Sequence, residues 1–195
     1  MKTNVGILIF HEVEVLDLAG PFEVFGITET GGEKPFHVWT VSERDELIRA
    51  RNGLQVKANF TFGNCPVPDI LIVPGGYGAE KIEIQNPVTL HWIAEQNLST
   101  EITASVCTGA FLLAKAGVLT NQRVTTHWMD VGDLQSAYPA LRVEKDVKFV
   151  DEGRIVTSAG ISAGIEMSLH LVARICGMET AVTTAKRMDY RWTPS

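Results

Sequence analysis

The segment ASVCTGAFLLAKAG (residues 104–117) places one cysteine between a short apolar run and a stretch rich in small and apolar residues. The apolar run ITASV (102–106) predicts a buried strand, and the stretch that follows predicts a helix. Cys107 then lies where a strand turns into a helix, the junction that α/β proteins with a parallel sheet repeat. The segment therefore indicates the fold class and singles out one thiol.

Strands and helices alternate along the rest of the chain as well. Further strands are predicted at 5–10, 36–42, within 69–76 and at 123–128, hairpins about 52–53 and 151–153, and helices at 87–97, 130–137, 164–177 and 178–188. Another helix is predicted to follow a turn at Asp17, with Pro21 in its first turn. This pattern predicts a three-layer α/β/α sandwich around a mostly parallel sheet, formed as one domain over residues 1–195.

The overall composition limits the classes of function. The 195 residues include 17 Lys and Arg against 23 Asp and Glu, for a formal net charge of −6. Such a charge gives no general attraction to nucleic acid or to anionic membranes. The N-terminal sequence resembles neither a secretory signal nor a transit peptide, and no apolar stretch approaches the ~20 residues of a membrane helix. A cytoplasmic protein with neither nucleic-acid nor membrane partners is expected.

The three cysteines, Cys65, Cys107 and Cys176, are odd in number and lack CxxC spacing. Free thiols in a reducing compartment are therefore expected, and Cys65 and Cys176 are predicted to be structural. The sequence also lacks HExxH, paired Cys/His spacings and phosphate-binding loops. Neither a metal nor an organic cofactor is expected.

The residues around Cys107 are similar to the G-x-S-x-G turn of hydrolases, with small residues two positions before and after the nucleophile. Unpaired N–H groups at the start of the following helix are expected to lower the pKa of the thiol. The N–H of Thr108 is a candidate oxyanion donor, and the loop at Gly75 and Gly76 is a candidate second donor. The alternative is that Cys107 is a small core residue, because free cysteines are often buried.

Ligands of open α/β sheets bind beyond the carboxyl ends of the strands, where Cys107 and the loops at Asp17 and Gly75 are expected to meet. Asp17 is either an acid that shuttles a proton to the thiol or an ordinary helix cap. His127, on the predicted strand 123–128, is either the base of a Cys-His pair or a core histidine. Candidates for the walls of the pocket are Tyr77, Phe22 and Trp128.

The chain resembles the ThiJ/PfpI superfamily of class I glutamine amidotransferase-like proteins in five segments, which are LIFHEVEVLDLAGPFEVF, DILIVPGG, ASVCTGAFLLAKAG, VTTHW and TSAGISAGIEMSLHLVARICG. Within it, Asp17 and the Cys107-Thr108 pair are similar to those of the isonitrile hydratase-like branch. The resemblance implies a flavodoxin-like fold, a homodimer, no cofactor and a reactive elbow cysteine with Asp17 as its acidic partner. It also implies hydration of a small isonitrile to an N-substituted formamide. In that reaction Cys107 forms a thioimidate, Asp17 supplies the proton, and Asp17 and the Thr108 hydroxyl position the water.

Other functions stay open. PfpI-type proteases and amidases carry His directly after the nucleophile, where this chain has Thr108, so an amidase-like activity is a minor alternative. Glyoxalase or deglycase activity, found in other branches, is another alternative. The segments TTHW and TSAGISAGIE also resemble the sensor domain of AraC-type regulators, which makes a freestanding small-molecule or oxidation sensor the non-enzymatic alternative.

Overall fold

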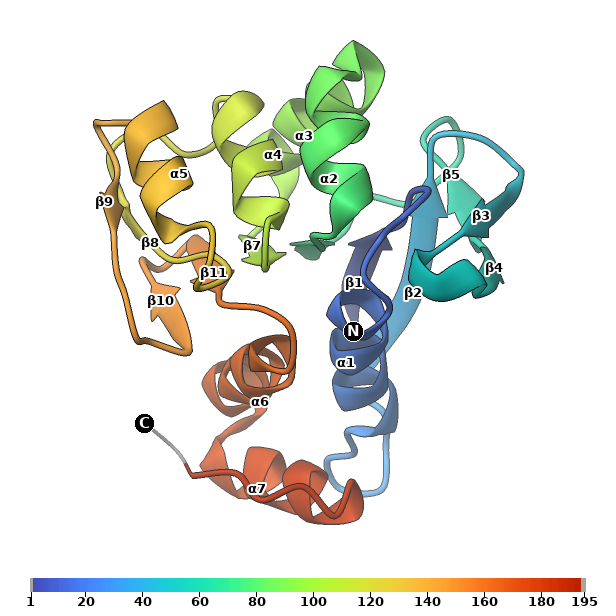
Figure 1. Cartoon of the computed structure of the whole chain (residues 1–195). Helices are drawn as coiled ribbons and strands as arrows, with labels where there is room; N and C mark the ends of the chain where they lie inside the picture. The colour runs from blue at the N-terminus through green and yellow to red at the C-terminus, as the bar shows by residue number, and fades with distance from the viewer. Residues whose placement is uncertain (1, 194–195) are drawn as a thin grey trace.

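The computed structural model describes residues 2–193 and contains a seven-stranded sheet flanked by helices (Figure 1). The strand order is β10-β11-β7-β6-β1-β2-β5, in which β10 and β11 pair antiparallel and the other neighbours pair parallel. These strands are β1 (Thr3–Leu8), β2 (Phe36–Ser42), β5 (Phe60–Thr61), β6 (Ile70–Val73), β7 (Ile102–Val106), β10 (Phe149–Asp151) and β11 (Ile155–Ser158). The predicted mostly parallel central sheet is confirmed.

Helices form the two outer layers. They are α1 (Val15–Ile27), α2 (Tyr77–Lys81), α3 (Pro87–Ser99), α4 (Gly109–Lys115), α5 (Val131–Ala137), α6 (Ala163–Cys176) and α7 (Met178–Arg187). Helices α1, α6 and α7 contact one another in one layer, and α2, α3 and α4 lie together in the other (Figure 1). Across residues 2–193, no helix has both the length and the apolar composition that crossing a membrane requires.

Both predicted hairpins are present. Strands β3 (Leu47–Arg49) and β4 (Gln55–Lys57) pair antiparallel around a tight turn, in which Asn52 and Gly53 adopt positive φ angles of 60° and 88°. Strands β10 and β11 form the second hairpin at one edge of the main sheet. The Asn-Gly pair therefore correctly predicted the turn of this hairpin.

The predicted strand at 123–128 is present only at its first two residues. Strand β8 covers only Arg123–Val124 and pairs with β9 (Arg142–Val143) outside the main sheet. Thr126 then donates its hydroxyl proton to the carbonyl of Cys107 at 2.8 Å. This bond ties the segment to the strand-to-helix junction, so the backbone does not continue along a neighbouring strand.

The first helix begins earlier than predicted. Helix α1 (Val15–Ile27) already contains Asp17 in its first turn, and Pro21 lies inside the helix, so the turn predicted at Asp17 is wrong. An interior proline costs ~3 kcal/mol or more, because it lacks an N–H and its ring crowds the preceding turn. Burial of the apolar face of α1, including Val24 and Phe25, offsets this cost. Asp17 is consequently held on a helix and not on a loop.

One close contact joins β1 to β2 in the core. Gly6 of β1 lies opposite Trp39 of β2, and a Cβ atom on Gly6 would be 2.6 Å from Cη2 of the buried Trp39 ring. The same ring meets the ring of Phe60 edge-to-face, and the two ring centroids are 5.5 Å apart. Trp39 therefore has packing partners that leave little room for it to move.

We predict that Gly6→Ala lowers the free energy of unfolding by about 1–3 kcal/mol, the usual cost of overpacking a core. Gly26→Ala is the matched control, because a Cβ at Gly26 in α1 meets no described atom within 4 Å. Alanine is the better helix former, so the control is expected to be neutral or stabilising by up to ~1 kcal/mol. Urea unfolding of the three proteins measures both effects, and equal stabilities would refute the packing argument.

Candidate functional site

A pocket of about 340 Å³ opens at the edge of the sheet where parallel strands β6 and β7 end. Four of the residues singled out from the sequence line it, and these are Gly76, Tyr77, Cys107 and His127. Ligand pockets of open α/β sheets are expected at this edge. The predicted meeting of the segments that follow β1, β6 and β7 is thus observed.

Cys107 occupies a sharp elbow between β7 and α4. Its φ angle is +55°, a left-handed conformation that non-glycine residues rarely adopt. Its N–H donates to the carbonyl of Ser158 at 3.1 Å. A Cβ atom on Gly160 would lie 2.6 Å from the Cys107 sulfur, and one on Gly109 would overlap the carbonyl of Val73. The small residue predicted two positions after the nucleophile is therefore required by close backbone approach.

Asp17 is fully buried beneath this elbow. Its Oδ2 accepts a hydrogen bond from the N–H of Gly75 at 3.0 Å, whereas Oδ1 is buried without a hydrogen-bond partner among the described residues. Burial raises the pKa of Asp17 to about 8, and the charge of Glu14 adds to this rise; the hydrogen bond from Gly75 and, least of all, the neighbouring Cys107 thiol act in the opposite direction. At neutral pH, Asp17 is a carboxylic acid that can donate a proton.

The pKa of Cys107 contradicts the sequence-based expectation. Burial, followed by the charge of Asp17, raises the pKa of the Cys107 thiol well above its ordinary value. The N–H and hydroxyl of Thr108 favour the thiolate but do not overcome burial. Helix α4 has seven residues, and the thiol at its start is only 7% exposed, so the loss of hydration outweighs the helix dipole. The thiol is protonated at rest.

The N–H groups of the Gly75-Gly76 loop, predicted to offer a second oxyanion donor, are both hydrogen-bonded within the protein. The N–H of Gly75 bonds to Asp17, and the N–H of Gly76 donates to Oγ1 of Thr108 at 3.0 Å. Both groups therefore have acceptors within the protein and are not free to serve as the predicted second oxyanion donor. The loop instead orients the acid and the hydroxyl that flank Cys107. The bond from Gly76 also leaves the Thr108 O–H free to donate.

His127 lies in the pocket wall, after the short strand β8 and not on a strand of the main sheet. Its Nδ1 is 3.2 Å from Oδ2 of Asp130, which favours the tautomer with the proton on Nδ1 and leaves Nε2 as an acceptor. The Cδ2 edge of the ring and the Cys107 sulfur both lie against Gly160. The ring is therefore a close neighbour of the thiol.

The candidate wall residues have different outcomes. Tyr77 lines the pocket, and the guanidinium of Arg51 lies 5.8 Å from its ring centroid. Trp128 is 74% exposed, lies beside His127 at a centroid distance of 5.7 Å and is outside the lining. Phe22 is on the exposed side of α1 and does not line the pocket either. Of the three, Tyr77 lines the pocket, and Trp128 and Phe22 do not.

Six lining residues were not predicted from the sequence, and these are Glu14, Arg51, Glu80, Met129, Asp130 and Ile161. Two of them carried a signal in their spacing. Glu14 precedes Asp17 by one helical turn, and Asp130 follows His127 by three residues. Arg51 carried none, because it comes from the β3–β4 hairpin, which only the tertiary fold brings to the pocket.

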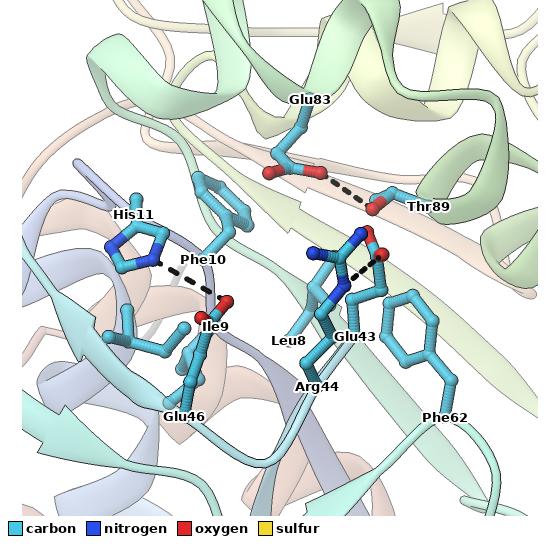
Figure 2. Close-up of a pocket in the computed structure, with 11 residues that line it drawn as sticks. Leu8, Ile9, Phe10, His11, Glu43, Arg44, Glu46, Phe62, Glu83 and Thr89 are labelled. Atoms are coloured by element: carbon cyan, nitrogen blue, oxygen red, sulfur yellow. Dashed lines mark hydrogen bonds and ion pairs between the residues drawn. The ribbon is translucent and has the colours of Figure 1, made fainter.

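A second cavity, of about 150 Å³, lies at the same end of the sheet near the ends of β1 and β2 (Figure 2). Figure 2 shows its polar side chains paired with one another: His11 with Glu46, and Arg44 with Glu43 at 3.0 Å. Its lining contains no cysteine within the described part of the chain. Cys65 and Cys176 are partly buried free thiols, and neither lines the pocket at Cys107. The candidate site is therefore the pocket at Cys107.

The sequence matches the DJ-1/PfpI family over residues 3–174. The chain belongs to this family. DJ-1/PfpI relatives include isonitrile hydratase from Pseudomonas putida, which is 34% identical over all 195 residues, a region covering 81% of that protein. The predicted superfamily and its isonitrile hydratase-like branch are thereby supported by a full-length match.

Other relatives of this DJ-1/PfpI chain include a transcriptional regulator and proteins of known structure. The HTH-type transcriptional regulator GbdR of Pseudomonas aeruginosa is 27% identical over 96% of this chain, which spans only 50% of the regulator. Among solved structures, a ThiJ/PfpI family protein from Pseudomonas syringae aligns with 100% of this chain and 77% of its own at a TM-score of 0.88 and 25% identity. Drosophila melanogaster DJ-1beta aligns over 98% of this chain and 100% of its own at 0.84 and 17% identity, and shares the fold.

The raised pKa of Asp17 predicts a pH-dependent stability. Since the folded state raises this pKa from 3.8 to about 8, the wild type loses stability as the pH rises through that interval. Asp17→Asn has no proton to lose, so its free energy of unfolding should exceed that of the wild type by a margin that grows up to about pH 8. The margin is expected to reach a few kcal/mol. Urea unfolding of both proteins at several pH values measures the margin, and a margin that does not change with pH would contradict the burial argument.

Proposed function

We propose that this protein is an isonitrile hydratase, which adds water to a small isonitrile and releases an N-substituted formamide. The observation that carries the proposal is a buried carboxylic acid, Asp17, next to a thiol that lines a pocket. The raised pKa of Asp17, about 8, supplies a proton donor at neutral pH. The full-length match to isonitrile hydratase supports the choice of substrate class.

The first step joins the thiol to the substrate. The Cys107 sulfur forms a bond to the terminal carbon of R–N≡C while Asp17 gives its proton to the same carbon. The thiol proton passes to Asp17, which is protonated again at the end of the step. The product is a thioimidate, R–N=CH–S, bound to Cys107. This transfer requires no free thiolate at rest, which suits the raised pKa of the thiol.

The second step releases the product. Water adds to the thioimidate carbon, and the carbon–sulfur bond breaks. One water proton goes to the nitrogen and the other to the Cys107 sulfur, which gives R–NH–CHO and restores the thiol. In this proposal the hydroxyl of Thr108, which accepts a hydrogen bond from the N–H of Gly76, and the carboxyl of Asp17 orient this water. The mechanism needs no cofactor.

A second candidate function is a ligand sensor, which the match to a transcriptional regulator over 96% of this chain favours. The pKa of Cys107 argues against the oxidation-sensing form of this hypothesis. Oxidation to sulfenic acid proceeds from a thiolate, and burial raises the pKa of this thiol. A small-molecule sensor would bind its ligand in the same pocket without turnover.

The homodimer and the cytoplasmic location stay predictions.

Catalysis by Cys107 predicts that Cys107→Ala abolishes formamide production from an isonitrile. The matched control is Cys65→Ala, because Cys65 is a partly buried free thiol outside the pocket. The measurement is formamide released per protein molecule over many turnovers. Full activity in Cys107→Ala would refute the mechanism, and release of at most one equivalent by the wild type would favour the sensor.

Proton donation by Asp17 predicts that Asp17→Asn lowers the turnover rate by a factor of about 10²–10⁴, the usual contribution of acid–base catalysis. In the wild type, kcat/KM is expected to fall as the pH rises above about 8, where the acid loses its proton. The pH profile of kcat/KM checks this directly. A flat profile between about pH 6 and 10 would remove Asp17 from the role of proton donor.

A further inference from the structure

We propose that the pocket at Cys107 selects small molecules that carry a cationic group at the end remote from the reacting atom, and that Glu14 is its main specificity-determining residue. The inference deepens the proposed function and rests on it for the identity of the reacting group alone. It is carried by the distribution of charge around the pocket.

The ionisable lining of the pocket is mostly acidic. Glu14, Glu80 and Asp130 contribute three carboxyl groups, and Arg51 is the cationic side chain of fixed charge that faces them. Arg51 is already paired, because its Nη1 lies 3.0 Å from Oε2 of Glu12. The positive charge of the wall is therefore largely neutralised.

The carboxyl groups differ in how far they are compensated. Asp130 is paired with His127 at 3.2 Å, and Glu80 has Lys81 at 3.9 Å. Glu14 has no ion-pair partner among residues 2–193. Its charge acts on the pocket without a counter-ion, and it also acts on Asp17 beneath. A ligand cation is the missing partner that this arrangement favours.

The position of Glu14 is fixed by the backbone. Its N–H donates to the carbonyl of Gly75 at 2.9 Å, so it is attached to the loop that holds Asp17 and Thr108. Cys107 lines the same pocket, whereas Asp17 is fully buried and lies outside the lining. A molecule that places its reacting atom at the sulfur therefore has its remote end among the acidic side chains. The volume, about 340 Å³, suits a small molecule.

The test uses methanethiosulfonate reagents that differ in charge, so it does not depend on isonitrile chemistry. Each reagent forms a mixed disulfide with Cys107 and expels methanesulfinate. One carries a trimethylammonium group, the other a sulfonate. The rate of modification of Cys107 is followed by peptide mass spectrometry and divided by the rate for a simple thiol such as N-acetylcysteine amide. The ratio of the two normalised rates removes any change in the reactivity of the sulfur itself.

The normalised ratio is expected to favour the cationic reagent by about tenfold or more at low ionic strength and to approach one at high salt. Glu14→Gln should lower the ratio by about threefold or more. The matched control is Glu101→Gln, which removes the same charge from an exposed residue at the other end of β7, about 20 Å away, and should leave the ratio unchanged.

A ratio near one, a preference for the sulfonate, or equal ratios in Glu14→Gln and Glu101→Gln would overturn the proposal. The proposed function is tested by a different measurement, and it is refuted if the protein does not hydrate neutral isonitriles. A cation preference in a protein that hydrates no isonitrile supports this inference and refutes the hydratase. Hydration of isonitriles with no charge preference supports the hydratase and refutes the charge inference.

Discussion

The site depends on one constraint, which is the left-handed backbone of Cys107 packed between three loops. The positive φ angle turns the chain so sharply that only Cys107 and Thr108 lie between β7 and α4, and the sulfur faces the pocket. This turn is possible because the neighbouring positions that touch it, Gly109 and Gly160, have no side chain. The bonds to Ser158 and Thr126 hold the strained residue in place from both sides.

The same close packing determines where the protons are. Burial penalises the charged forms of Asp17 and Cys107, so the pKa values of both groups are raised and both favour their neutral forms. Many cysteine enzymes hold a thiolate ready beside a positive charge. Here the neighbour of the thiol is an acid, and each group affects the pKa of the other. Chemistry at this site is therefore suited to adding a nucleophile and a proton to the same small molecule.

Much of this could be predicted from the sequence. The apolar runs and the Gly-rich junctions indicated the sheet, and the small-x-Cys-x-Gly pattern indicated the elbow and its position at the sheet edge. The start of α1 was missed because Pro21 usually marks a first turn, and only burial of Val24 and Phe25 makes an interior proline acceptable. The direction of the Cys107 pKa shift was missed because it depends on burial, which a local pattern does not contain. Arg51 was missed for a similar reason, since a hairpin far away in the sequence brings it to the pocket.

The two outermost strands of the main sheet, β5 and β10, have only two and three residues. A long unpaired strand at a sheet margin is a template on which another chain can add a strand, and this is a common route to aggregation. Margins as short as these expose few free N–H and C=O groups. Copies of this chain are therefore poorly suited to joining by extension of the main sheet.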